Sequence, residues 1–131
     1  MDKMKLVYEA ISARDMSHCP YSGFAVGAAL LEKDGRIFRG ANIENASYGA
    51  SVCAERTALF GALCSGAREF CAIAVVGGEA GKRISSYCSP CGICRQVLSE
   101  FCASDFEIIT YDGENIKSFT LGELLPERFE L

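Results

Sequence analysis

The chain has 131 residues, of which half are hydrophobic and 23% are charged, so it can build a core and predicts one domain over residues 1–131 rather than a disordered chain. Its net charge of −4, from 13 basic and 17 acidic residues, excludes the Lys- and Arg-rich surface that nucleic-acid binding usually requires, and it disfavours a membrane surface. No apolar run reaches the roughly 20 residues of a membrane-spanning helix. We expect a soluble, cytoplasmic protein that acts on a small molecule.

The first third of the chain predicts a helix and then a β-hairpin. Residues 3–15 carry hydrophobic side chains at helical spacing, which indicates an amphipathic helix. The pattern of residues 24–31 favours a strand, residues 33–36 are typical of a hairpin turn, and residues 36–42 form the partner strand. Residues 42–50 are polar and contain glycine, so we expect a loop of the kind that often carries binding groups.

Two further helices are predicted from their capping residues. Ser51 is the expected N-cap of a helix over residues 52–65, and Ser89-Pro90 is expected to begin a helix that runs to about Cys102. The other predicted elements are a strand buried on both faces at 70–76, strands at 106–111 and 116–120, and a helical turn at 121–125. This order predicts an α/β fold, a three-layer α/β/α sandwich around a five-stranded mixed sheet.

The cysteines are the residues most suited to bind a metal ion. The chain has eight cysteines but only one histidine, His18, so a metal site must rely on sulfur. Cys53 falls at the start of one predicted helix, and Cys91 and Cys94 share a face at the start of the other. In a layered α/β fold, two helices that each follow a strand can direct their N-termini to one sheet edge, where three thiolates would leave the fourth position of Zn²⁺ open for water. The cysteines expected to be small core residues are Cys19, Cys64, Cys71 and Cys102.

Glu55 supplies the acid–base group that such a site needs. It lies two residues after Cys53, so on a helix it points away from the metal-bound sulfur and is free to hydrogen-bond water and substrate. It lies four residues after Ser51, whereas a capping box requires three. The spacing C-x-E…P-C-x-x-C is the signature of zinc nucleobase deaminases in its three-cysteine form. Next in the chain, Arg56 is expected to offset the negative charge of three thiolates through hydrogen bonds to sulfur.

Longer segments resemble the small, homotetrameric cytidine deaminases. The resemblance lies in residues 24–29, 42–48, 53–58 and 89–96, and residues 124–129 resemble the C-terminal end of that family. It implies one Zn²⁺ per chain, bound by Cys53, Cys91 and Cys94, with Glu55 moving protons during hydrolytic deamination of cytidine and 2′-deoxycytidine in pyrimidine salvage. It further implies a homotetramer with shared active sites. The implied substrate-binding residues are Asn42 and Glu44 at the ribose hydroxyls, Phe24 beside the base, and Tyr48 and Phe129 offered across a subunit interface.

Three other interpretations are compatible with part of the pattern. Cys88 could complete a four-thiolate structural zinc site, but the open position would then be lost and Glu55 would have no use. A redox pair at Cys91 and Cys94 gives no use to Cys53. Within the deaminases, a cytosine-bearing antibiotic such as blasticidin S is the alternative substrate, and the ribose-binding residues favour a nucleoside.

Overall fold

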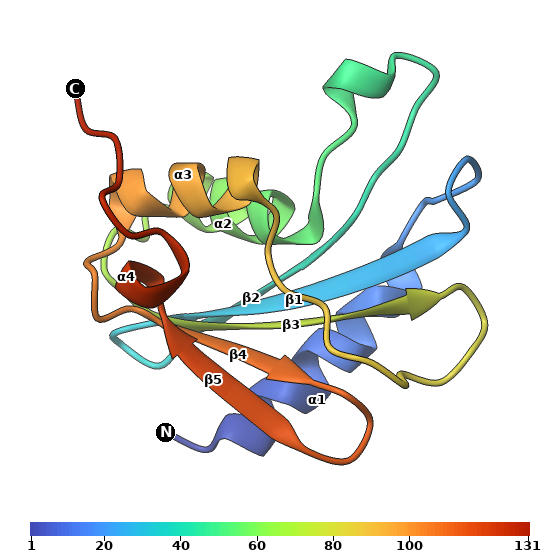
Figure 1. The fold of residues 1–131 in the computed structure, drawn as a ribbon, viewed down its shortest axis with the longest axis horizontal. Coiled ribbons are helices and arrows are strands. Elements are labelled where there is room, and N and C mark those ends of the chain that lie inside the picture. The colour runs from blue at the N-terminus through green and yellow to red at the C-terminus, as the bar shows by residue number, and fades with distance from the viewer.

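The structure, a computed structural model, describes residues 1–131 and places a five-stranded mixed sheet between helices (Figure 1). The strands are β1 (Phe24–Glu32), β2 (Ile37–Ala41), β3 (Phe70–Glu79), β4 (Glu107–Tyr111) and β5 (Ile116–Thr120). The helices are α1 (Lys3–Ala13), α2 (Ala54–Cys64), α3 (Gly92–Phe101) and α4 (Leu121–Leu124), with short 3-10 helices η1 (Arg14–Met16) and η2 (Tyr48–Ala50). The predicted fold class and the order of elements are confirmed.

The topology of the sheet brings the starts of two helices to one edge. The strand order is β2-β1-β3-β4-β5, and both β2 and β3 are antiparallel to β1. These two strands therefore run in the same direction and end at the same edge of the sheet. Because α2 follows β2 and α3 follows β3, both helices begin near that edge, as helices that follow parallel strands do.

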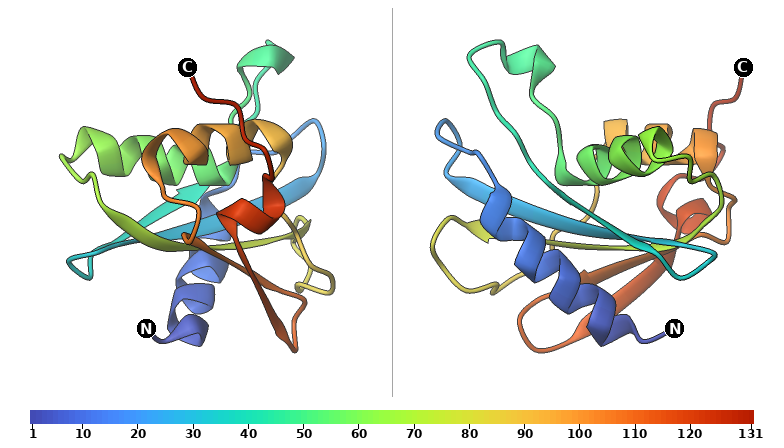
Figure 2. Two further views of the ribbon diagram at one scale, coloured as in Figure 1. Left: turned by 60° about the vertical axis from the view of Figure 1, so that its left-hand side comes forward. Right: turned by 180° about the vertical axis from the view of Figure 1, so that it is seen from behind.

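Each face of the sheet has its own hydrophobic core. Helix α1 covers one face, and α2, α3 and α4 cover the other (Figure 2). Along β3, Ile73 and Val75 belong to the core beneath α2 and α3, whereas Ala74 and Val76 belong to the core beneath α1. This two-sided burial explains the uninterrupted apolar run of that strand, and it confirms the three-layer sandwich.

Helix α2 lies unusually close to strand β2. A Cβ atom added to Gly40 would come within 2.4 Å of the carbonyl oxygen of Ala54 and of the amide nitrogen of Ala58. The absence of a side chain at this strand position therefore lets the first turns of α2 rest directly on the sheet. The close approach fixes the height of the helix start above the sheet, which is where Cys53 lies.

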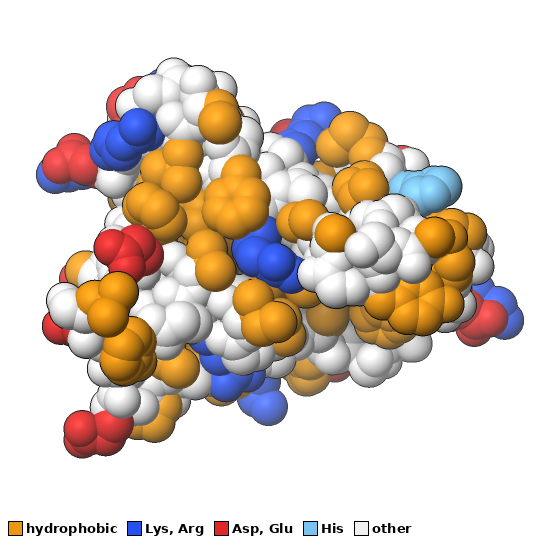
Figure 3. All heavy atoms as spheres, turned by 90° about the horizontal axis from the view of Figure 1, so that it is seen from above, with side chains coloured by type: hydrophobic (Ala, Val, Ile, Leu, Met, Phe, Trp, Pro, Cys, Tyr) orange, Lys and Arg blue, Asp and Glu red, His pale blue; other side chains and the backbone are white.

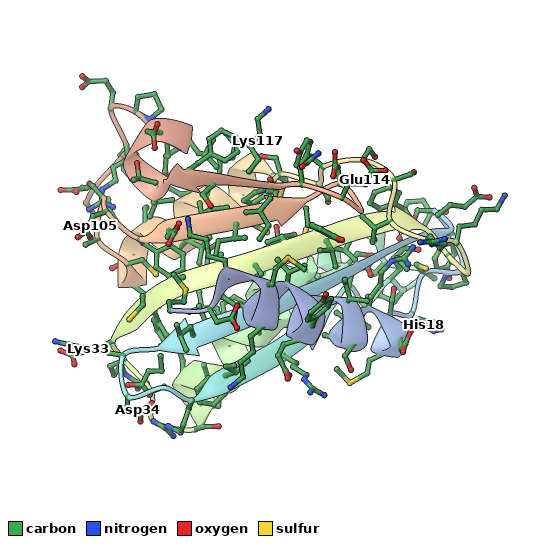
Figure 4. All side chains as sticks on the ribbon, turned by 90° about the horizontal axis from the view of Figure 1, so that it is seen from below. His18, Lys33, Asp34, Asp105, Glu114 and Lys117 are labelled. Carbon is green, nitrogen blue, oxygen red and sulfur yellow. The ribbon has the colours of Figure 1, made fainter.

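Residues 42–53 form an arm that projects from the body between β2 and α2 and carries η2 (Figure 1). Its base is closed by reciprocal backbone hydrogen bonds between Ile43 and Val52, and His18 pairs with the same base. Figure 4 shows His18 at the opposite end of the molecule from Lys33 and Asp34, which form the β1–β2 turn. No helix combines the length and the hydrophobicity needed to span a bilayer.

Candidate metal centre and active site

The two helix starts differ from the prediction in a way that matters for the site. The N-caps are Cys53 and Cys91, not Ser51 and Ser89. Both serines are engaged elsewhere, since Ser51 Oγ accepts the amide of Asn45 at 3.3 Å and Ser89 Oγ accepts the guanidinium of Arg95 at 2.8 Å. The helices consequently begin at residues 54 and 92. Two of the cysteines predicted to bind a metal ion thus occupy the position whose side chain faces the free amides of a helix.

Three thiols converge at this edge of the sheet. The Sγ atoms of Cys53, Cys91 and Cys94 all lie within 4.8 Å of one another, and those of Cys53 and Cys91 are 3.8 Å apart. Zn–S bonds of about 2.3 Å at tetrahedral angles require sulfurs about 3.8 Å apart. The thiols therefore fit Zn²⁺ in number, chemistry and spacing, and they leave one coordination position without a protein sulfur.

Hydrogen bonds between the thiols shift the pKa values of Cys53 and Cys94 in opposite directions. The pKa of Cys53 is lowered to about 5, first because Cys94 hydrogen-bonds to its sulfur and then because Arg56 does, while burial acts in the opposite direction. The pKa of Cys94 is raised, mainly by that same hydrogen bond to Cys53 and by burial. A cation bound between these sulfurs would favour the ionised form of both thiols.

Cys88 does not join this group. Its sulfur lies beside Gly77 and near the side chains of Phe24 and Val26, and burial raises the pKa of its thiol to about 11. The metal-ligating group formed by the structure contains Cys53, Cys91 and Cys94 without it. A four-thiolate structural site is therefore not assembled.

Glu55 is the one buried carboxylate at the site. It is only 4% exposed, and its pKa is raised, mainly by burial and further by the charge on Cys53. Its neighbour Arg56 donates from Nη2 to Cys53 Sγ at 3.4 Å, while the buried Nε of Arg56 has no partner. A buried carboxyl group with a raised pKa, beside thiols that could hold a cation, is the arrangement that general acid–base chemistry uses.

A cavity of about 230 Å³ opens directly onto these groups. The residues that line it are Val26, Asn42, Glu44, Ser51, Val52, Cys53, Ala54, Glu55, Cys88, Ser89 and Cys91. A larger hollow of about 440 Å³ lies elsewhere, beside Arg14, Lys82 and Arg83, but the thiol group does not line it. We place the active site in the smaller cavity because the thiols and the buried carboxylate are there.

The two predicted ribose-binding residues lie at the cavity and are already engaged within the protein. The Asn42 side chain accepts from the amide of Val26 and donates to the carbonyl of Phe24. Glu44 accepts from the backbone amides of Tyr21 and Ser22 and from the Ser22 hydroxyl, and these hydrogen bonds lower its pKa. Both residues therefore hold backbone segments of the cavity wall in place, and Glu44 is ionised at neutral pH.

The three predicted aromatic residues are not among those that line the cavity. Tyr48 is 71% exposed on η2, and Phe129 is 64% exposed near the C-terminus. Phe24 is half-exposed at the start of β1, where its ring edge packs against Gly77. The folded single chain thus brings Cys53, Glu55 and the other thiols together but leaves Tyr48 and Phe129 on outlying segments.

Sequence reasoning missed several residues that line the cavity, among them Val26, Val52 and Ser89. Val26 could have been found from strand alternation, because it lies two residues after Phe24 and so shares its face of β1. Val52 and Ser89 flank the metal ligands by one or two residues, which is itself a signal of proximity.

Three thiols that fit Zn²⁺ and leave one coordination position free, beside a buried glutamate, are typical of zinc-dependent hydrolases. Comparison with known proteins identifies the family within this class of enzymes. Residues 1–110 match the family model for the cytidine and deoxycytidylate deaminase zinc-binding region. The chain belongs to this family, and Zn²⁺ is its cofactor.

Individual relatives agree over nearly the whole chain. A cytidine deaminase of Halalkalibacterium halodurans is 52% identical over 130 residues, which cover 98% of this chain and 95% of that protein. A cytidine deaminase of Sporosarcina psychrophila is 46% identical, with 98% and 92% covered. The crystal structure of a cytidine deaminase from Burkholderia pseudomallei matches with a TM-score of 0.89 at 45% identity, covering 98% of this chain and all of that one.

Proposed function

We propose that this chain is a zinc-dependent cytidine deaminase that hydrolyses cytidine and 2′-deoxycytidine to uridine and 2′-deoxyuridine with release of ammonia. The observation that carries the proposal is the buried Glu55 carboxylate beside three thiols that fit an open zinc site. Family membership supports it, since the named relatives are cytidine deaminases.

The chemistry divides between the ion and Glu55. Cys53, Cys91 and Cys94 would hold Zn²⁺, which would supply the Lewis acidity that activates a water molecule. Glu55 accepts a proton from that water and delivers it to ring N3, which makes C4 electrophilic. The water oxygen bonds to C4. Glu55 then takes the remaining proton from that oxygen and passes it to the amino group, so the C4–N bond breaks, the C4=O bond of the product forms and ammonia leaves. Proton transfer of this kind contributes roughly 10²- to 10⁴-fold to the rate.

Replacing Glu55 tests this assignment. Glu55→Gln should retain one Zn²⁺ per chain and lose turnover, because the amide cannot carry the proton. Cytidine loss is followed by ultraviolet absorbance and zinc is counted in the same preparation. Glu100→Gln, which changes an exposed glutamate of α3, is the matched control and should keep both. Full activity in Glu55→Gln would refute the mechanism.

We further propose that Asn42 and Glu44 hold the ribose hydroxyls and that Phe24 packs beside the base. The first two line the cavity, and the hydrogen bonds that fix them in the wall support a preorganised role. The ionised carboxylate of Glu44 has oxygen lone pairs left to accept from hydroxyl groups, and it would repel a 5′-phosphate. These features support a nucleoside substrate.

We also propose a homotetramer in which Tyr48 and Phe129 complete the active site of a neighbouring chain. Figure 3 shows hydrophobic side chains across the upper face of the molecule, and the exposed residues Tyr48, Ile93 and Phe129 come from the arm, α3 and the C-terminus. Exposed apolar groups from separate segments are typical of an interaction surface.

A mixing experiment tests whether sites are shared. Phe129→Ala and Glu55→Gln should each be impaired alone, because each site then lacks one group. Mixed oligomers would contain some sites with Glu55 from one chain and Phe129 from another, so activity should reappear after dissociation and reassembly. Failure to regain activity in demonstrably mixed oligomers would exclude sharing of Phe129.

We infer that residues 1–131 act as one deaminase domain in the cytoplasm and serve pyrimidine salvage. All eight cysteines are free, and a catalytic ion held by three thiolates suits a reducing compartment.

A further inference from the structure

Arg95, on α3, makes three hydrogen bonds that join two separate segments. Its Nε donates to the carbonyl of Pro90 at 2.7 Å and its Nη2 to Ser89 Oγ at 2.8 Å. Its Nη1 donates to the carbonyl of Leu124 at 2.8 Å. One guanidinium thus holds both the loop that enters Cys91 and the end of α4.

The loop side of this arrangement bears directly on the metal centre. Pro90 immediately precedes Cys91, so its carbonyl fixes the peptide plane from which that ligand projects. Ser89 lines the active-site cavity. Because the planar guanidinium sets the directions of all its donors at once, Arg95 constrains where the Cys91 backbone lies relative to Cys94 on its own helix.

The other side bears on the C-terminal segment, residues 121–131. Besides the bond from Arg95 to Leu124, the adjacent Gln96 donates to the carbonyl of Phe129 at 3.0 Å. Arg128 donates to the carbonyl of Cys102, just after α3, at 3.2 Å. Figure 1 shows this segment rising beside α3 to the C-terminus. The start of the segment is also held directly by the body, since Leu121 is fully buried and its amide donates to the carbonyl of Phe106. Residues 126–131, by contrast, are largely exposed.

We propose that Arg95 is a positioning residue that couples zinc binding at Cys91 and Cys94 to the ordering of the C-terminal segment. The proposal rests on the zinc site of the proposed function. Zinc fixes the loop at residues 89–91, the fixed loop holds the guanidinium in one orientation, and the guanidinium holds Leu124. Linkage requires the reverse effect as well, so an ordered segment strengthens zinc binding.

Two measurements that need no turnover test the coupling. Zinc affinity is measured by competition with a chromogenic chelator, and hydrogen exchange of residues 121–131 is followed by mass spectrometry with and without zinc. In the wild-type protein zinc should slow exchange in this segment. In Arg95→Lys the single ammonium cannot span both partners, so zinc should bind about 10-fold or more weakly and should no longer slow exchange there.

Two variants separate this role from a general effect on folding. Arg68→Lys removes a similar clamp, in which Nη1 donates to the carbonyls of Leu63 and Ala67, at the far end of α2 from Cys53; it should leave zinc affinity unchanged. Gln96→Leu should speed exchange at the end of the segment while zinc binds within about twofold of wild type, because the Pro90 bond remains.

The proposal is wrong if zinc has no effect on exchange of residues 121–131 in the wild-type protein, a result that does not depend on any variant folding. It is equally wrong if Arg95→Lys binds zinc no more weakly than Arg68→Lys does. If zinc slows exchange of residues 121–131 in the wild-type protein but that protein does not deaminate cytidine, the proposed function is wrong and the coupling stands. The two failures are therefore distinguishable.

Discussion

Replacing Arg56 by methionine should weaken zinc binding without weakening the fold. Three thiolates bring three negative charges to Zn²⁺, which leaves a net charge of −1, and Arg56 is the cationic side chain that contacts one of them, with Nη2 at 3.4 Å from Cys53 Sγ. Methionine keeps the length and the hydrophobic stem of arginine but removes the charge.

The size of the effect follows from the contact. A hydrogen bond to a charged group contributes about 1.5–3 kcal/mol, so a loss of about 2 kcal/mol corresponds to roughly 30-fold weaker zinc binding. The zinc-free fold loses the same contact with Cys53, but a second effect stabilises the variant. The buried Nε of Arg56 has no partner, and an unsatisfied buried donor costs about 1–3 kcal/mol. These two effects are similar in size and opposite in sign, so Arg56→Met should be about as stable as wild type in the absence of zinc.

The assay combines chelator competition for zinc, thermal unfolding in the presence of a chelator, and ultraviolet measurement of cytidine loss. Arg83→Met is the control, because Arg83 is exposed and makes no hydrogen bond or ion pair. Zinc affinity and turnover within twofold of wild type in Arg56→Met would refute the electrostatic role.

Two other changes probe the walls of the cavity. Gly77→Ala would place a methyl group 2.8 Å from Cys88 Sγ and 2.9 Å from the Phe24 ring, so KM for cytidine should rise about fivefold or more with zinc content unchanged. Gly78→Ala is the control and should not change KM, because the nearest atom to its added methyl group is at 3.4 Å. Equal effects of the two substitutions on KM would contradict this explanation. Hydrogen bonds from Ser22 and Tyr21 lower the pKa of Glu44, so its contribution is present above the unfolded pKa of about 4.3 and is lost as the pH falls through the lower folded value. Amide exchange at Tyr21 and Ser22, corrected for intrinsic rates, should accelerate on acidification in wild type and be fast at all pH values in Glu44→Gln; pH-independent protection in wild type would contradict this.

Most of the fold follows from patterns that are local in the sequence. Residues 70–76 form a continuous apolar run, and β3 is indeed buried on both faces over most of its length. The turn at Asp34-Gly35 is where the predicted hairpin reverses, with Gly35 at a positive φ of 98°. Such elements are predictable because steric and hydrophobic preferences within a few residues determine them.

Predictions of burial failed for residues whose exposure depends on contacts between distant parts of the chain. Cys64 and Cys71 were expected in the core, but both are exposed, because one ends α2 and the other lies near the start of β3, beyond the covered part of each element. Cys102 is buried as expected. The hydrophobic residues that surround a cysteine in the sequence do not show where the elements that cover it in the fold end.

The convergence of the three thiols could be predicted because zinc coordination constrains their spacing. Cys91 and Cys94 must share a helical face, and the helix with Cys53 must begin at the same sheet edge. By contrast, nothing in the sequence shows that Asn42 and Glu44 hold backbone groups of Val26 and Ser22, since those bonds join segments 16 to 22 residues apart.

The position of Cys53 at the start of α2 implies a conflict between stability and metal binding. Its backbone has N-cap geometry, with φ −73° and ψ 156°, yet its side chain makes no capping hydrogen bond. Serine is among the best N-cap residues and stabilises a helix by about 1 kcal/mol relative to a residue that does not cap. Without zinc, Cys53→Ser should therefore unfold about 3–5 °C above wild type.

With zinc the order should reverse, because only the native wild-type protein binds the ion tightly and is stabilised by it. Thermal unfolding of both proteins, with a chelator and with excess zinc, measures the reversal. Cys64→Ser, at the exposed last residue of the same helix, should change neither value. If Cys53→Ser were also less stable than wild type in the presence of the chelator, the reasoning would be refuted. Packing of the cysteine side chain, and not metal binding, would then explain why Cys53 lies at the helix N-terminus.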